Sequence, residues 1–152
     1  MSLEDDMALL SRVALLAGLE RDALRLLAFA AEPRQLRAGD VLFRKGEPSD
    51  GGYVVTQGAV AMIEDETRTA DAIIGPGGLI GEIALITETK RPATAIAREP
   101  THVLRISRAM FRRTMEEYPE LAKRLANDLR HRVTSISADL SRVKRRLDPG
   151  RR

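Results

Sequence analysis

The fold of this chain is decided by one stretch, residues 75–95, which reads GPGGLIGEIALITETKRPATA. Its opening glycines free the backbone to take positive φ, and a proline among them fixes one φ, so a turn is expected there. The apolar run at 83–86 predicts a short helical segment, followed by a polar loop over 87–90. The β-branched run at 94–96 predicts a strand. A turn, a helical segment and a strand therefore surround Arg91.

This stretch combines groups that suit an anion bound beside a hydroxyl. The start of the short helical segment offers unpaired N–H groups with a partial positive charge, and Gly81 lets an oxyanion approach the backbone. Arg91 adds a planar fork that can bind two phosphate oxygens. Glu82 would repel a phosphate, so it fits only if it pairs with Arg91 or accepts hydrogen bonds from a ligand hydroxyl, as an acidic residue does for ribose in dinucleotide sites. Phosphate and ribose together predict a nucleotide.

The residues resemble the phosphate-binding cassette of the cyclic nucleotide-binding domain family. That cassette consists of Gly-Glu-aliphatic-Ala-Leu, a variable loop and Arg-x-Ala-Ser/Thr, and here residues 81–85 read GEIAL and residues 91–94 read RPAT. Upstream, residues 38–60 also resemble the family, with the pattern AGDVLFxxGExxDxxYVVxxGxV. The resemblance covers about residues 8–147, and its specificity comes from the two signatures together.

The resemblance implies a role for each cassette residue. Glu82 would bind the ribose 2′-hydroxyl, and Arg91 would bind the exocyclic oxygens of the cyclic phosphate. Backbone N–H groups of Ile83 and Ala84 would assist, and Thr94 would contribute a hydroxyl. The ligand-binding residues predicted in this way are Gly81, Glu82, Ile83, Ala84, Arg91, Pro92, Ala93, Thr94 and Arg132. The ligand is cyclic AMP or cyclic GMP, and no other cofactor and no metal is expected.

Two residues depart from the family pattern. Pro92 follows the arginine, where the family often donates a backbone N–H to the phosphate, and proline has none. A hydrogen bond to a charged group contributes roughly 1.5–3 kcal/mol, so a weaker but intact site is expected. Ile80 stands where the family often has an aromatic residue, which we interpret as a change in packing.

Composition limits the other possibilities. The chain has 152 residues, enough for one domain spanning 1–152, and its 43% hydrophobic and 31% charged residues are typical of a soluble globular protein. It has no Cys, no apolar run long enough to cross a membrane and an acidic N-terminus, so a cytoplasmic protein is expected. His102 and His131 lie in different segments, which argues against a β-barrel metalloenzyme. No Ser/His/Asp motif is present, and no enzyme activity is predicted.

The fold class expected is α+β. Helices are predicted within residues 4–33, a β region over 35–106 and further helices over 107–147. Many short strands with Gly-rich turns suggest a sandwich or barrel, and the family resemblance specifies a jelly-roll-like β-roll. The predicted strands are 41–43, 53–56, 59–63, 72–74, 93–97 and 102–106.

Helix ends are predicted from capping and breaking residues. The first helix is expected over 4–17, where Gly18 ends it, and the second over about 20–31, where Pro33 ends it. Helix returns at about residue 107, because Ser107 is a good N-cap.

The last helix, expected over 119–147, carries an apolar stripe with spacings that alternate between four and three residues. This heptad seam predicts a parallel homodimer, whereas a single helix lying on its own domain would leave the stripe beyond Val133 uncovered. Residues 123–152 hold ten Lys/Arg against three Asp/Glu, which we interpret as a solvated helix face rather than a nucleic-acid contact. The seam consists of Ala122, Ala126, Leu129, Val133, Ile136, Leu140, Val143 and Leu147.

In the bacterial cyclic AMP receptor family, the corresponding helix also contacts the nucleotide. By this resemblance, Arg132 matches an arginine that helps to hold the ribose-binding glutamate. Ile136 and Ser137 match a Thr-Ser pair that contacts adenine, and Ile136 cannot make that hydrogen bond. The choice between cyclic AMP and cyclic GMP therefore stays open.

Three functions fit the sequence. The leading hypothesis is a cyclic-nucleotide sensor that rearranges its last helix, with a homodimeric partner and no membrane partner. The second is the sensor half of a transcription regulator of the cyclic AMP receptor and Fnr type, but the residues after Leu147 are too few for a helix-turn-helix domain. The third is a dimeric scaffold with a degenerate ligand site, a possibility that Pro92 and Ile136 leave open.

Overall fold

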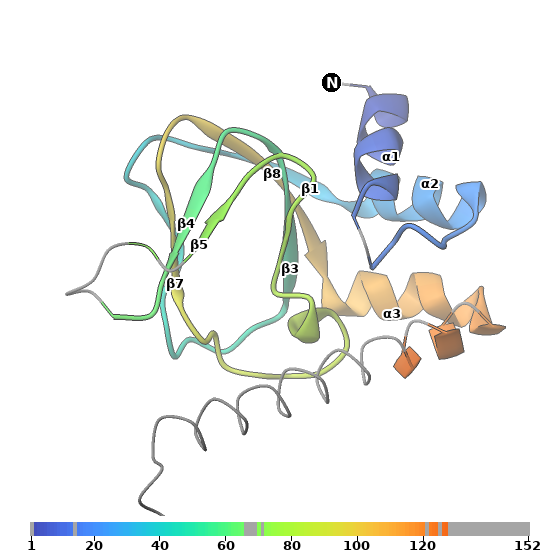
Figure 1. Ribbon diagram of the computed structural model, residues 1–152. Coiled ribbons are helices and arrows are strands. Elements are labelled where there is room, and N and C mark those ends of the chain that lie inside the picture. Colours follow the sequence, from blue (N-terminus) through green and yellow to red (C-terminus); the bar gives the residue numbers. More distant parts are fainter. Residues whose placement is uncertain are drawn as a thin grey trace, which may run out of the picture.

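The computed structural model describes residues 2–13, 15–65, 70, 72–120, 122–124 and 126–127. Within these ranges, two antiparallel four-stranded sheets form a roll, and the helices gather at one end of it (Figure 1). This α+β architecture confirms the predicted β-roll flanked by helices. One sheet has the order β1 (Glu32–Leu36), β8 (Thr101–Ser107), β3 (Gly51–Gln57) and β6 (Leu79–Ile80). The other sheet has the order β2 (Val41–Phe43), β7 (Thr94–Ala97), β4 (Val60–Ile63) and β5 (Ala72–Ile74).

The first helix is shorter than predicted. Helix α1 (Leu3–Ser11) begins with a capping box between Ser2 and Asp5 and ends at Ser11 instead of residue 17. The chain then continues in tight turns, in which the Leu16 N–H donates to the Val13 carbonyl and the Leu19 N–H donates to the Leu16 carbonyl. Leu15, Leu16 and Leu19 are all buried. Because adjacent residues of one helix point in different directions, turns bury these side chains together more completely than a continued helix would.

The second helix and the first strand follow closely on one another. Helix α2 (Arg21–Ala30) buries Leu24 and Leu27, as its spacing predicts. Strand β1 then begins at Glu32, two residues after the helix ends. It was not predicted from the sequence, because it is polar and largely exposed. It is an edge strand that pairs with β8 alone, so Pro33 is tolerated within it.

Each strand predicted from the sequence is present, with ends that differ by at most two residues. Helix α3 (Arg108–Glu116) begins at the predicted N-cap, where the Ser107 hydroxyl accepts a hydrogen bond from the Met110 N–H at 3.1 Å. The short strand β6 was not predicted, because two residues after a glycine turn give no periodicity.

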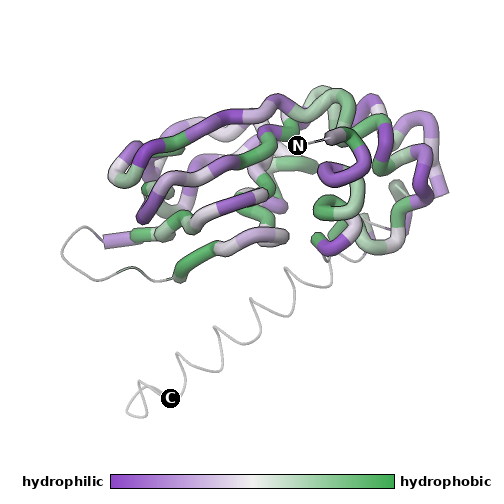
Figure 2. Tube along the Cα trace, turned by 90° about the horizontal axis from the view of Figure 1, so that it is seen from above, coloured by the Kyte–Doolittle hydropathy of each residue, from purple (hydrophilic) through white to green (hydrophobic). Residues whose placement is uncertain are grey.

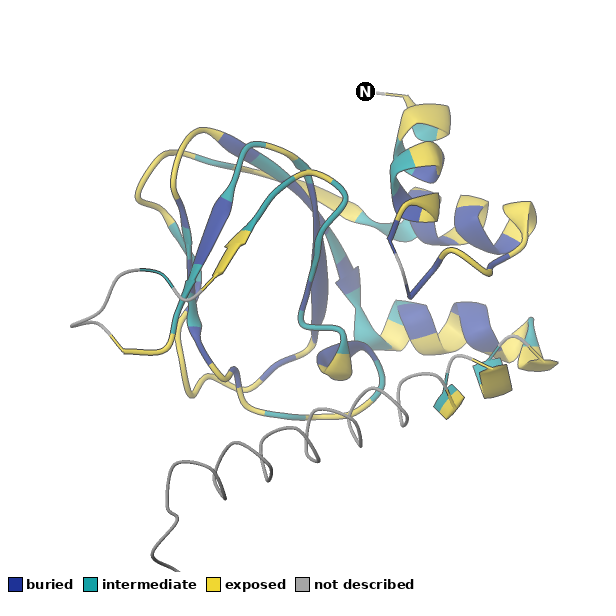
Figure 3. Ribbon diagram, viewed as in Figure 1, coloured by how far each residue is buried: buried dark blue, intermediate teal, exposed yellow. Residues whose placement is uncertain are grey.

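The alternation of side chains along β3 separates two cores. Val54 faces the helices and packs in a cluster with Leu104 of β8 and Phe111 of α3. Tyr53 and Val55 face the inside of the roll. Figure 3 shows the buried segments of the strands and helices in dark blue, and Figure 2 shows hydrophobic and hydrophilic segments interspersed along the chain. This arrangement places the Tyr53 ring inside the roll.

The last predicted helix is described only in its first residues. Residues 119–120, 122–124 and 126–127 are helical. The rest of the predicted helix, including Arg132, Ile136 and most of the dimer seam, lies outside the described residues. In the part of the chain that is described, no helix combines the length and the apolar character needed to cross a bilayer.

Candidate functional site

The predicted cassette encloses a pocket on the side of the roll next to α3. The chain leaves β6, turns at Gly81 and forms the 3₁₀ helix η1 (Ile83–Leu85), which confirms the predicted short helical segment. The pocket has a volume of about 320 Å³. We call it the cassette pocket, and its lining residues are Gly81, Glu82, Ile83, Ala84, Thr89, Lys90, Arg91 and Pro92.

Arg91 is the most unusual residue of the cassette pocket, because its side chain is only 5% exposed. Its guanidinium carbon lies 4.2 Å from the ring centroid of Phe43 and 5.8 Å from that of Tyr53. Such cation–π contacts favour a flat cation over a ring face. The ring faces do not replace the acceptors that the N–H donors of Arg91 need, and its Nε is buried with no hydrogen-bond partner among the described residues.

Burial also affects the pKa of Arg91. Loss of water lowers the pKa of this guanidinium, and the nearby Arg108 adds to that effect, whereas Tyr53, Asp50 and Glu47 oppose it. None of the ion pairs recorded for the described residues includes Arg91. A cation held away from water without an ion pair is a strong site for an anionic ligand.

Gly81 is required at the base of the cassette pocket for two reasons. Its φ of +82° is strained for any residue with a Cβ. A Cβ built at this position would also lie 2.6 Å from Nη1 of Arg91. The guanidinium therefore packs directly against the glycine backbone.

The second wall of the pocket is held by the loop between β2 and β3. The Gly46 N–H donates to the Arg91 carbonyl and the Arg91 N–H donates to the Glu47 carbonyl, both at 2.8 Å. The Ser49 N–H donates to the Thr89 carbonyl at 2.9 Å. These bonds place Thr89 and Lys90 on the pocket wall, and sequence reasoning missed both residues. Their pairing with a loop 40 residues upstream leaves no local sequence signal.

The predicted site residues fall into three groups. Gly81, Glu82, Ile83, Ala84, Arg91 and Pro92 come together around the cassette pocket. Ala93 and Thr94 do not line it. Ala93 is buried, and the Thr94 hydroxyl accepts a hydrogen bond from the Lys45 N–H at 3.0 Å. Arg132 lies outside the described residues.

Ile80, the other departure from the family pattern, is buried among Phe43, Tyr53 and Val55. It therefore fills part of the interior of the roll, which agrees with a packing role. Within the described ranges, no group of three or more His, Cys, Asp or Glu residues is placed to hold a metal ion.

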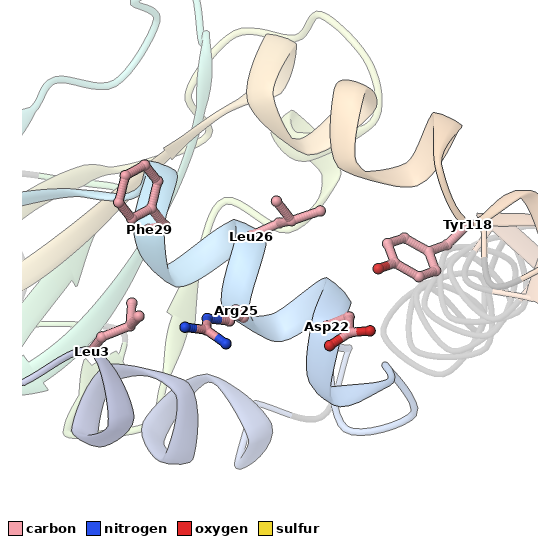
Figure 4. Close-up of a pocket in the computed structure, with 6 residues that line it drawn as sticks. All are labelled: Leu3, Asp22, Arg25, Leu26, Phe29 and Tyr118. Atoms are coloured by element: carbon pink, nitrogen blue, oxygen red, sulfur yellow. The ribbon is translucent and has the colours of Figure 1, made fainter.

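A larger depression lies elsewhere, between α1, α2 and the segment after α3 (Figure 4). Its volume is about 550 Å³, and Figure 4 shows its side chains coming from these separate elements. Phe29 on this surface is 81% exposed. We call it the Phe29 groove, and its lining residues are Leu3, Asp22, Arg25, Leu26, Phe29 and Tyr118.

The roll, the 3₁₀ turn and the buried arginine are together the features of a β-roll with a candidate site for a small anionic ligand. The sequence model of the cyclic nucleotide-binding domain matches residues 33–118, and this chain belongs to that family. The match includes every lining residue of the cassette pocket.

Two solved structures and one curated relative illustrate the family. A cyclic nucleotide-binding-like protein from Brucella abortus is 42% identical, with a TM-score of 0.67 over 74% of this chain and 98% of that chain. The N-terminal domain of a transcriptional regulator from Streptomyces coelicolor A3(2) is 29% identical, with a TM-score of 0.77 over 87% of this chain and 94% of that chain. Lysophospholipase nte1 from Neurospora crassa is 30% identical over 76% of this chain. The chain spans only 8% of the length of that enzyme.

Proposed function

We propose that this domain is a regulatory sensor that binds cyclic AMP or cyclic GMP in the cassette pocket and is not itself an enzyme. The family fold supports a regulatory role. The observation that carries the proposal is the buried guanidinium of Arg91, which packs against Gly81 on the wall of the pocket and whose Nε has no hydrogen-bond partner among the described residues. A cyclic phosphate would supply the anionic oxygens that this group lacks.

In this proposal, each residue of the cassette has its own partner on the ligand. Arg91 binds the exocyclic phosphate oxygens, and the N–H groups of Ile83 and Ala84, at the start of η1, add donors. Glu82 accepts a hydrogen bond from the ribose 2′-hydroxyl. Pro92 contributes its ring to the wall but no N–H. The supporting role of Arg132 and the ligand role of Thr94 remain predictions.

The proposed output is a change in the position of the last helix, which would dimerise through its heptad seam. A ligand can drive such a change only if it binds one arrangement more tightly than the other. The whole chain, residues 1–152, would act as this single sensor domain, and a cytoplasmic location is proposed with it.

Two alternatives are supported by specific observations. The likeness to the N-terminal domain of a regulator from Streptomyces supports a sensor half of a transcription regulator. The proline at position 92 supports a dimeric scaffold with a degenerate site. Nucleotide binding separates the scaffold from both sensor functions.

The deciding experiment is calorimetric titration of ligand-free protein with cyclic AMP and with cyclic GMP. We expect micromolar or tighter binding of at least one nucleotide and its loss in Arg91→Ala. The matched control is Arg98→Ala, which removes an exposed arginine seven residues away. Absence of heat with both nucleotides would overturn the sensor proposal and leave the scaffold. Equal loss in the Arg98 and Arg91 variants would overturn the assignment of the site.

A further inference from the structure

Arg108 lies at the first position of α3 and does not line the cassette pocket, yet its side chain is bonded to both sides of it. Nε donates to the carbonyl of Ala84 at 2.9 Å. Nη2 donates to the carbonyl of Ser49 at 2.8 Å and to its hydroxyl at 3.0 Å. One guanidinium thus binds two segments that are far apart in the sequence.

These two segments lead to the two stretches of chain that line the pocket, residues 81–84, which we call the first wall, and residues 89–92, which form the second wall. Ala84 is itself a lining residue of the first wall. Ser49, which is 5% exposed, reaches the second wall through Thr89. Its N–H donates to the Thr89 carbonyl at 2.9 Å, and its hydroxyl accepts from the Thr89 N–H at 3.3 Å. Arg108 is therefore bonded to the first wall directly at Ala84 and to the second wall through Ser49.

The chemistry of the contact suits arginine in particular. The acceptors of Arg108 are two carbonyls and a hydroxyl, and none of the ion pairs recorded for the described residues includes this side chain. The planar fork directs Nε and Nη2 toward two separate acceptors at once, which the single ammonium of a lysine cannot reproduce. Hydrogen bonds from a charged donor are also stronger than neutral ones.

The backbone of Arg108 fixes the fork in place. Its N–H donates to the Asp50 carbonyl at 2.6 Å, next to Ser49. On the other side, Leu85 of η1 packs in the same buried cluster as Phe111 of α3. Movement of either pocket wall would therefore strain or break contacts with the first turn of α3.

We propose that Arg108 is a positioning residue that clamps the two walls of the cassette pocket to α3, so that Arg91 and the N–H groups of η1 converge on one phosphate. The identity of the ligand rests on the proposed function, whereas the clamp itself is a property of the ligand-free protein. The two parts can therefore be tested separately.

The experiment measures residue-resolved amide hydrogen exchange in ligand-free protein and calorimetric affinity for cyclic AMP and cyclic GMP. The variants are Arg108→Ala and Arg108→Lys, and the control is Arg113→Ala, which removes an exposed arginine from the same helix. In Arg108→Ala we expect amide exchange over residues 83–91 to rise about tenfold. We expect the affinity for the bound nucleotide to fall about tenfold, because a displaced Arg91 would lose about one hydrogen bond to the phosphate. Arg108→Lys should lie between this variant and the wild type.

Amide hydrogen exchange in β3 and β8 reports the global stability of each variant and serves as the internal reference. If Arg108→Ala fails to fold, Arg108→Lys decides the question, since it keeps the charge and the stem but not the fork. Exchange over 83–91 equal to that of Arg113→Ala would overturn the clamp. A looser pocket with unchanged affinity would overturn the positioning role. If exchange rises but the wild type binds neither nucleotide, the proposed function fails while the clamp stands.

Discussion

The cassette pocket and the Phe29 groove differ in how their charges are held. The groove is the larger, about 550 Å³ against about 320 Å³, and its charged residues, Asp22 and Arg25, are exposed to water. In the cassette pocket, Arg91 is almost fully buried against ring faces and a glycine. A charge removed from water interacts much more strongly with an anion than a charge at the surface does. The burial of the charge, rather than the volume of the depression, is the reason for proposing the cassette pocket as the binding site.

The most severe test of this comparison is Arg91→Met, which keeps an apolar stem of similar length. We expect the affinity for the nucleotide to fall at least about 100-fold, because two hydrogen bonds to a charged group are lost. We also expect the free energy of unfolding of the ligand-free protein to rise by about 1 kcal/mol, because a buried charge without a hydrogen-bonded anion is costly. Calorimetry and urea denaturation measure the two effects. A variant that loses stability instead would show that Arg91 is mainly a core residue.

A smaller effect is expected from Gly81→Ala. The new Cβ would clash with Nη1 of Arg91, and the alanine backbone would be strained at the positive φ of this position. We therefore expect the nucleotide affinity to fall about tenfold and the free energy of unfolding to fall by about 1–2 kcal/mol. The matched control is Gly77→Ala. Gly77 has a similar φ of +86°, but a Cβ there would meet nothing within 4 Å. Equal effects of the two variants on nucleotide affinity would show that backbone strain alone, and not the contact with Arg91, explains the result.

The smallest effect is expected from Phe29→Ser in the groove. Because the Phe29 ring is 81% exposed, we expect unfolding free energy to change by no more than about 0.5 kcal/mol and nucleotide affinity to stay within about twofold. Phe111→Ser, at a ring that is buried, should destabilise the fold strongly and is the contrasting control. A clear loss of nucleotide affinity in Phe29→Ser would break the comparison, since it would connect the groove to the site.

Much of the cassette could be predicted because its information is local. The glycines, the apolar run at 83–86 and the β-branched run at 94–96 each specify their own backbone conformation, and all three predictions are confirmed. The predicted end of the first helix was wrong, because apolar residues at 13, 14 and 17 continue the helical spacing, whereas the structure buries Leu15, Leu16 and Leu19 in turns. Strand β1 was missed for the opposite reason, since an exposed edge strand needs no apolar residues.

The sequence by itself determined the family, the roll of short strands and the residue types of the proposed anion site, since turn, strand and cassette signals depend on neighbouring residues. Tertiary structure alone decided that Arg91 lies over Phe43, that the loop at 46–49 holds Thr89 and Lys90 on the wall, and that Arg108 connects both walls to α3. These contacts join segments between 24 and 59 residues apart. Their geometry depends on how the two sheets close, and no periodicity in one segment records where another segment will lie.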